Sequence, residues 1–378
     1  MLHPKILNLI ILIFTRFLLT QSSPLVPALY VLGDSLVDSG NNNMLPTFAR
    51  ANYAPYSVNF PGKIPLGRFN NGRTVTDFIA EYLELPYPRP YASTTRTNWN
   101  GSSDTNLVKE NSSKGRNYAS AACGILPETG TFLGKCFPMD EQIGMFKRSI
   151  DYELAPVFKS PGELLQHLSK SIFFICAGNS DYLQNYFQTL FPSSKLYNPP
   201  KFAQLLVDKL SQQLKRLYEL GARKVIVTEI GPLGCTPSVA KNPSRMINLQ
   251  GNNNGMCDEG ANNIVSSFNN QLPFMIENLT STLPESLFTI AAVNTFSYDV
   301  IMDPSIYGFS DRSNSCCTTW WNDMLTCVPE QSPCPDPSKY IFWDGYHPTE
   351  AAFSMLFNQW VKDPSTCFPL SFKQIVES

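Results

Sequence analysis

Five short apolar segments, spread along most of the chain, constrain the fold more than any other feature of the sequence. They are too short to be mistaken for long helices, and several read as continuous apolar runs without alternation. Continuous runs of this kind are typical of parallel strands that are buried on both faces. The segments occupy residues 28–32, 116–119, 171–176, 224–230 and 287–293.

Amphipathic helical patterns lie between and after these segments. They cover residues 74–83, 200–220, 258–279 and 348–361, and Pro273 weakens the third of them. Strands that alternate with helices predict an α/β fold, here a three-layer α/β/α sandwich around a five-stranded parallel sheet. In such folds ligands bind at the carboxyl ends of the strands.

The composition fits one large enzyme-like domain. The chain has 378 residues, of which 43% are hydrophobic, and it contains no Gly/Ser-rich linker and no internal repeat. We therefore expect a single domain over residues 24–378. The formal net charge of -2 gives no electrostatic reason to expect nucleic acid or an anionic membrane as a partner.

Residues 1–23 have the pattern of a secretory signal peptide. Lys5 precedes an apolar centre at residues 6–15, and Ser22 and Ser23 are the small residues expected at a cleavage site. An uncleaved membrane anchor is the alternative, but the uninterrupted apolar run falls short of the roughly 18 residues needed to span a bilayer. No other segment is apolar over that length, so we expect a secreted, extracellular protein without an integral membrane span in the mature chain.

The cysteines and the glycosylation sequons agree with export. Ten cysteines occur without paired C-x-x-C units, so disulfides in an oxidising compartment are favoured over a zinc site. Cys176 lies in an apolar segment and is a candidate free core thiol. Glycosylation sequons begin at Asn100, Asn111 and Asn278.

The first apolar segment ends in Gly33, Asp34 and Ser35, which places a serine at the carboxyl end of a predicted strand. Such a serine is either a nucleophile or an ordinary turn residue. Asp34 is expected to bind backbone N–H groups of the loop and to shape the turn.

A serine nucleophile needs a base, and histidine is the side chain suited to that task. The chain has only three histidines, and His3 belongs to the predicted signal. His167 lies in a helical pattern and is expected to be a solvated helix residue. His347 remains as the candidate base, with Asp344 as the carboxylate that fixes its tautomer. The alternative is that Asp344 and His347 only cap the last helix.

The motifs around these residues resemble the plant GDSL esterase/lipases of the SGNH hydrolase superfamily. Six segments match the blocks of that family in their usual order and cover nearly the whole mature chain. They are GDSLVDSGNN at 33–42, RFNNGRTVTDFIAEYL at 68–83, NYASAACGIL at 117–126, AGNSDY at 177–182, KVIVTEIGPLGCTP at 224–237 and FWDGYHPTEAA at 342–352.

The resemblance implies roles for individual residues. Ser35 corresponds to the nucleophile and the first oxyanion donor, His347 to the base and Asp344 to its partner. Ala122 stands where many relatives have glycine, and its backbone N–H is a candidate second donor. Ser180 stands where the family has asparagine, and Asn179 precedes it by one residue. Two alternatives stay open: a weaker oxyanion hole built with Ser180, or one completed by Asn179.

The sequence thus predicts a secreted serine esterase or lipase that needs neither a metal nor an organic cofactor. Its expected partner is a small-molecule, lipid or cell-wall ester, and we expect a monomer. One alternative keeps the mechanism but acts as a cell-wall polysaccharide O-acetylesterase or as an acyltransferase. The other is a secreted binding protein that keeps the fold with little turnover, which the serine at position 180 favours.

Overall fold

The computed structural model describes residues 24–93, 112–242 and 256–378. A six-stranded sheet lies at its centre, with strand order β2-β1-β3-β4-β5-β8. All neighbours pair in parallel except β5 and β8. The strands are β1 (Leu29–Gly33), β2 (Gly115–Asn117), β3 (Ile172–Cys176), β4 (Lys224–Thr228), β5 (Leu287–Ala291) and β8 (Cys367–Phe368).

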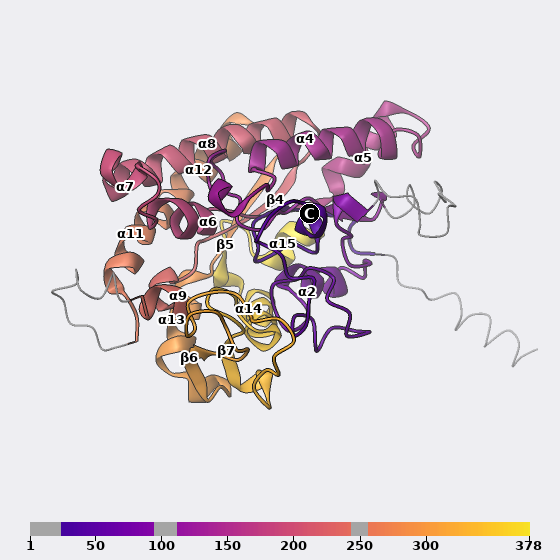
Figure 1. Ribbon diagram of the computed structural model, residues 1–378. Coiled ribbons are helices and arrows are strands. Elements are labelled where there is room, and N and C mark those ends of the chain that lie inside the picture. The colour runs from indigo at the N-terminus through magenta and orange to yellow at the C-terminus, as the bar shows by residue number, and fades with distance from the viewer. Residues whose placement is uncertain (1–23, 94–111, 243–255) are drawn as a thin grey trace, which may run out of the picture.

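Helices cover both faces of the sheet, as Figure 1 shows. On one face α4 (Met139–Ser149), α5 (Pro161–Lys170), α8 (Pro199–Glu219), α11 (Glu259–Asn269) and α12 (Leu272–Thr282) contribute to a core that includes Tyr30 and Phe173. On the other face α2 (Val75–Tyr82), α14 (Glu350–Lys362) and α15 (Phe372–Glu377) pack against Val31 and Phe174. Successive strand residues point to opposite faces, so a strand with helices on both sides buries both sets of side chains, and β3 is accordingly apolar at every position.

The predicted fold class is confirmed. The five predicted strands are the five parallel strands, with shorter bounds than expected for β2, β4 and β5. The sixth strand, β8, was not predicted because it has only two residues and is followed directly by Pro369. It pairs antiparallel with the end of β5, where it covers the sheet edge.

The predicted helix at 258–279 is wrong as a single element. The structure has α11 and α12 instead, with the break at residues 270–271. Pro273 lies in the first turn of α12. Backbone N–H groups in a first turn have no partner within the helix, so a proline there costs no hydrogen bond. Inside one long helix the same proline would have removed a backbone hydrogen bond.

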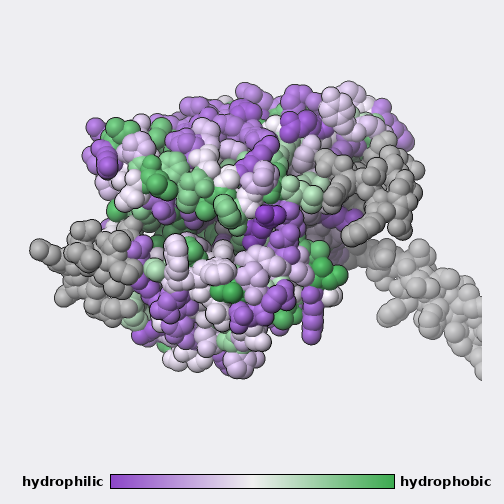
Figure 2. All heavy atoms as spheres, in the orientation of Figure 1, coloured by the Kyte–Doolittle hydropathy of each residue, from purple (hydrophilic) through white to green (hydrophobic). Residues whose placement is uncertain are grey.

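A smaller part of the chain lies beyond the carboxyl ends of the strands. It contains α13 (Asn294–Met302), the parallel pair β6 (Asp311–Ser315) and β7 (Tyr340–Phe342), and the short helices α6 (Asn179–Asp181), α7 (Ser193–Leu196) and α9 (Pro237–Ala240). Figure 2 shows the surface hollowed between the half that carries α4 and α8 and the half that carries β6 and β7.

Eight of the ten cysteines form disulfides, as the even count indicated. The pairs are Cys123–Cys136, Cys235–Cys257, Cys316–Cys334 and Cys317–Cys327. Cys176 is a buried free thiol, as expected, and Cys367 in β8 is a second one. Within the described ranges no helix combines the length and apolarity needed to cross a bilayer.

Candidate active site

The turn that follows β1 carries Ser35, and the path of its backbone requires glycine at position 33. The Asp34 N–H donates to the Cys176 carbonyl at 3.0 Å, which ties the turn to the end of β3. A Cβ on Gly33 would lie 2.1 Å from the same carbonyl oxygen. The Gln142 side chain brackets Gly33 with two hydrogen bonds of 2.9 Å, one to its N–H and one to its carbonyl. These hydrogen bonds fix the backbone that precedes Ser35.

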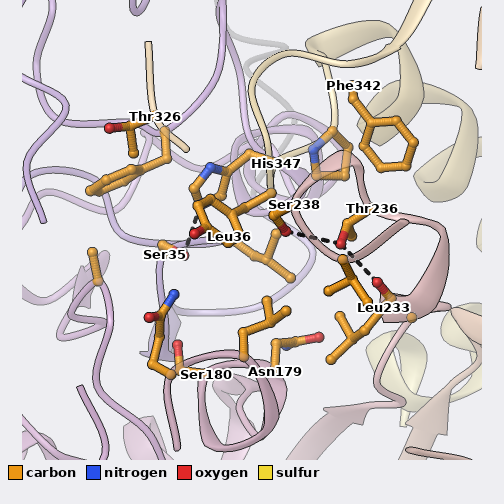
Figure 3. A pocket seen from close by; sticks show the side chains of 18 of the residues that line it. Ser35, Leu36, Asn179, Ser180, Leu233, Thr236, Ser238, Thr326, Phe342 and His347 are labelled. Atoms are coloured by element: carbon orange, nitrogen blue, oxygen red, sulfur yellow. Dashed lines mark hydrogen bonds between the residues drawn. The ribbon is translucent and has the colours of Figure 1, made fainter. Parts of the chain in front are cut away.

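Ser35, His347 and Asp344 form one hydrogen-bonded chain although 309 residues separate the serine from the aspartate. His347 Nε2 lies 2.8 Å from Ser35 Oγ, as Figure 3 shows. His347 Nδ1 lies 2.8 Å and 2.9 Å from the two oxygens of Asp344. A carboxylate only accepts, so the proton belongs on Nδ1 and Nε2 is left to accept from the serine hydroxyl.

The Asp344 carboxylate is fully buried and held by further donors. Its Oδ1 accepts from the N–H groups of Tyr346 and His347, both at 2.9 Å. Its Oδ2 accepts from the Tyr56 hydroxyl at 2.7 Å. These contacts compensate the burial of the charge and fix the plane of the carboxylate. The alternative of a mere helix cap does not describe Asp344, because Thr349 provides the cap of α14.

Tyr56 was missed by sequence reasoning. Its hydroxyl also accepts from the Cys327 N–H at 3.1 Å, so it connects Asp344 to the disulfide-closed loop 317–327. Burial and the nearby Asp344 carboxylate raise the pKa of Tyr56 well above its ordinary value, so the phenol stays protonated and donates. Tyr56 lies in an irregular segment far from Asp344 in sequence, and no motif or periodicity marks it.

Ser35, Ala122 and Ser180 line the same cavity. Ala122 has a backbone φ of 68°, the left-handed conformation that favours glycine. Within the described part of the chain, the N–H groups of Ser35 and Ala122 and the Ser180 hydroxyl make no hydrogen bond. Unused donors at a cavity wall are available to an incoming ligand oxygen.

The side-chain amide of Asn179, unlike the Ser180 hydroxyl, already donates a hydrogen bond. Its Nδ2 donates to Asp34 Oδ2 at 3.1 Å, and Asp34 Oδ1 accepts from the Leu36 N–H at 3.1 Å. The expected contact of Asp34 with a loop N–H is therefore confirmed. Burial of Asp34 outweighs these hydrogen bonds and raises its pKa to about 6. The pair links the turn after β1 to the loop after β3.

His167 lies on α5, away from Ser35. The expectation of a solvated residue is wrong, because its ring is half-buried, 4.7 Å from the Phe158 ring and 3.3 Å from the Tyr30 hydroxyl. Burial lowers the pKa of His167 to about 4, so it stays neutral. Its helix turns this face inward against the sheet, which the mixed polar and apolar pattern of the segment did not reveal.

The remaining predicted sites are on the surface or outside the described residues. Asn278 is exposed on α12. Asn100, Asn111 and residues 1–23 lie outside the described ranges. In the part of the chain that the structure describes, no group of three or more His, Cys, Asp or Glu side chains is arranged to hold a metal ion.

A serine, an imidazole and a carboxylate in one hydrogen-bonded chain, at the carboxyl edge of a parallel sheet, form the arrangement that serine hydrolases use. A family model described as GDSL-like Lipase/Acylhydrolase matches residues 29–360. The chain belongs to this family, is a carboxylic ester hydrolase and has the fold of the SGNH hydrolases.

Curated relatives agree over almost the full length. GDSL esterase/lipase 7 of Arabidopsis thaliana is 41% identical over 357 residues, which is 94% of this chain and 93% of the relative. GDSL esterase/lipase At1g71691 of the same plant is 38% identical over 360 residues, 94% of this chain and 87% of the relative. GDSL esterase/lipase At1g33811, also from Arabidopsis thaliana, is 36% identical over 375 residues, 98% of this chain and 96% of the relative.

Proposed function

We propose that the protein is a secreted serine esterase in which Ser35 is the nucleophile, His347 the general base and Asp344 the partner of the imidazole. The observation that carries this proposal is the 2.8 Å contact between His347 Nε2 and Ser35 Oγ. A hydroxyl is a poor nucleophile at neutral pH, and a hydrogen-bonded base removes its proton as it attacks.

The reaction proceeds through an acyl-enzyme. Ser35 Oγ forms a bond to the ester carbonyl carbon while its proton passes to His347 Nε2. The tetrahedral intermediate collapses, the bond to the alcohol oxygen breaks, and His347 protonates the leaving alcohol. Water then attacks the acyl carbon while His347 takes its proton. The bond between Ser35 Oγ and the acyl carbon breaks, the acid is released, and the proton returns to Ser35 Oγ. Asp344 stabilises the imidazolium in both steps.

The charge on the carbonyl oxygen needs donors that are free before substrate arrives. The N–H groups of Ser35 and Ala122 and the hydroxyl of Ser180 meet this requirement among the described residues. We assign these three groups to the oxyanion hole. Asn179 is assigned a supporting role, since its amide already donates to Asp34.

Export through an oxidising compartment is part of the proposal. It is supported by the four disulfides and by the exposed sequon at Asn278. Disulfides persist in secreted proteins and are rare in reducing compartments. Glycans at Asn100, Asn111 and Asn278 are proposed on the same ground, together with cleavage of residues 1–23.

Hydrolysis of p-nitrophenyl acetate by the mature chain, expressed through a secretory route, tests the proposal. We expect Ser35→Ala and His347→Ala to lose at least about 1000-fold in kcat, because the acyl-transfer machinery acts as a unit. Ser39→Ala is a matched control, since Ser39 is a nearby buried serine that donates to the Pro88 carbonyl and does not line the cavity. Equal rates for wild type, Ser35→Ala and His347→Ala would reject the proposal.

A further inference from the structure

The edge of the sheet beside β1 leads directly to Ala122. β2 is the edge strand, and the N–H groups of Tyr118 and Ser120, which follow it, donate to carbonyls of β1 at 2.8 Å and 3.0 Å. Alternate residues of an extended chain point their backbone groups to opposite sides. Ala119 and Ala121 therefore turn their backbone groups to the outer side of this edge, where buried carbonyls need partners other than a strand.

The side chain of Asn42 is the partner of the Ala121 carbonyl. Asn42 lies in the short helix η1 (Asn41–Met44) and is 1% exposed. Its Nδ2 donates to the carbonyls of Ala121 and Ala49, both at 2.9 Å, and its Oδ1 accepts from the Ser120 hydroxyl at 2.6 Å. Because a carbonyl only accepts, these contacts fix the orientation of the Asn42 amide and use both of its N–H groups.

The contact between Asn42 and the Ala121 carbonyl sets the direction of the Ala122 N–H. The peptide between Ala121 and Ala122 is trans, and the C=O and N–H of a trans peptide point in opposite directions within one plane. Since Asn42 holds the C=O on the outer side, the N–H faces the other way. Ala121 and Ala122 line the cavity that contains Ser35. A donor on the carbonyl also polarises the amide and strengthens its N–H as a donor.

The backbone conformation of Ala122 makes this restraint necessary. Its φ of 68° is left-handed, a conformation that is unfavourable for alanine. Rotation of the Ala121–Ala122 peptide by half a turn would return φ to a negative value and turn the N–H away from the cavity. The same rotation would break the hydrogen bond from Asn42 and leave the Ala121 carbonyl without its donor. Asp38 adds a second restraint, because its Oδ2 accepts from the Ala121 N–H at 3.1 Å.

We propose that Asn42 is a positioning residue for ester hydrolysis, which holds the Ala121–Ala122 peptide so that the Ala122 N–H faces the oxyanion. This inference rests on the assignment of that N–H to the oxyanion hole in the proposed function. Asn42 lies behind the cavity wall and acts on the reaction only through the Ala122 N–H. Its contribution therefore belongs to the step in which charge develops on the carbonyl oxygen.

Asn42→Ala tests this role in the hydrolysis of p-nitrophenyl acetate. We expect kcat to fall at least about tenfold with KM within about threefold of wild type, because the oxyanion is absent from the bound ester and losing one donor lowers the rate about 100- to 1000-fold. Circular dichroism reports whether the variant is folded. Asn42→Asp is the second variant, since it keeps the shape of the side chain and the acceptor for Ser120. Its ionised carboxylate donates to neither carbonyl, so kcat at pH 8 should fall by a similar factor.

Asn41→Ala is the matched control for Asn42→Ala. Asn41 is also buried, and its Nδ2 donates to the carbonyls of Asn117 and Ala119 at 3.0 Å and 2.8 Å. Its Oδ1 accepts from the Ala92 N–H at 3.0 Å. Each asparagine thus makes two donations and accepts one hydrogen bond, but only Asn42 holds the peptide of the oxyanion donor. Asn41→Ala should lower the free energy of unfolding to a similar extent and leave kcat within about threefold of wild type.

Ala122→Gly provides a readout that a purely structural role of Asn42 would not move. Without Asn42 the Ala121–Ala122 peptide relaxes toward negative φ at alanine, whereas glycine adopts positive φ about as readily as negative φ. Adding Ala122→Gly to Asn42→Ala should therefore raise kcat about fivefold, which corresponds to removing the left-handed penalty of alanine. The gain should be absent from the Asn41→Ala background, in which Asn42 still holds the peptide.

The inference is overturned if folded Asn42→Ala keeps kcat within about threefold of wild type, or if the two asparagine variants lose kcat equally. It is also overturned if Ala122→Gly raises kcat by the same factor in both backgrounds or in neither. Ser35→Ala, measured beside them, separates this inference from the proposed function. Wild-type hydrolysis by Ser35→Ala would reject the proposed function itself, whereas an inactive Ser35→Ala with an unaffected Asn42→Ala would reject the role of Asn42 alone.

Discussion

Substitution of Tyr56 by phenylalanine removes a single hydroxyl from the carboxylate that supports His347. The hydroxyl donates to Asp344 Oδ2 at 2.7 Å, and both side chains are buried. A hydrogen bond to a charged group contributes about 1.5–3 kcal/mol, and a stranded buried donor costs about 1–3 kcal/mol. Because the Cys327 N–H also loses its acceptor, we expect Tyr56→Phe to lower the unfolding free energy by about 2–4 kcal/mol.

The effect on the reaction should be smaller than that of losing Asp344. Oδ1 keeps the N–H donors of Tyr346 and His347, so the carboxylate still faces the imidazole. We expect kcat/KM for a soluble ester to fall about tenfold, far less than the roughly 10⁴-fold loss that follows a wrong tautomer.

Tyr53→Phe is the matched control for Tyr56→Phe. The Tyr53 ring contacts the Tyr56 ring edge to face, and its hydroxyl donates to the Cys327 carbonyl at 3.0 Å. It binds the same loop residue without touching Asp344. We expect loss of stability with kcat/KM within about twofold of wild type. Equal losses of activity in both variants would refute a direct role of Tyr56 on Asp344.

Three further perturbations test the oxyanion site and the buried acids. Ser180→Asn supplies a longer donor and should raise kcat about tenfold, since losing one oxyanion donor lowers the rate about 100- to 1000-fold. Steady-state kinetics that show slower or unchanged turnover would contradict the assignment of Ser180 to the oxyanion hole. Ala122→Gly removes left-handed backbone strain of about 1 kcal/mol and keeps the backbone N–H. Urea unfolding should therefore show a higher free energy of unfolding at similar activity. A lower free energy of unfolding would argue against strain at Ala122. Burial raises the pKa of Asp38 to about 6 and of Asp181 to about 7. The folded protein then binds more protons than the unfolded chain between about pH 4 and 7, so this contribution to the unfolding free energy falls as pH rises through that window. Asp181→Asn should make the unfolding free energy less dependent on pH in that window. An unchanged pH dependence would contradict the raised pKa of Asp181.

The parallel strands could be predicted because burial on both faces leaves a direct mark on the sequence. Ile172–Cys176 is apolar at every position, and its residues contribute to both cores. The same reasoning located Ser35, because the edge of a parallel sheet follows from where its strands end. His347 could be predicted as its neighbour because the chain has so few histidines.

Contacts between irregular segments could not be predicted. Tyr56 and Asp344 are 288 residues apart, and each lies in a loop whose path depends on the packing of the rest. The pairing of the cysteines has the same origin, since the spacing of Cys316, Cys317, Cys327 and Cys334 permits several connectivities. The left-handed conformation of Ala122 is likewise a property of the folded turn and not of alanine.

Covalent labelling with an alkyl fluorophosphonate tests the central claim, that His347 activates Ser35 as the nucleophile. We expect one adduct per chain, located on Ser35 by peptide mapping. Labelling should be at least about 100-fold slower in His347→Ala because the base no longer takes the serine proton. An adduct on another residue, or labelling of Ser35 at the wild-type rate in His347→Ala, would contradict it.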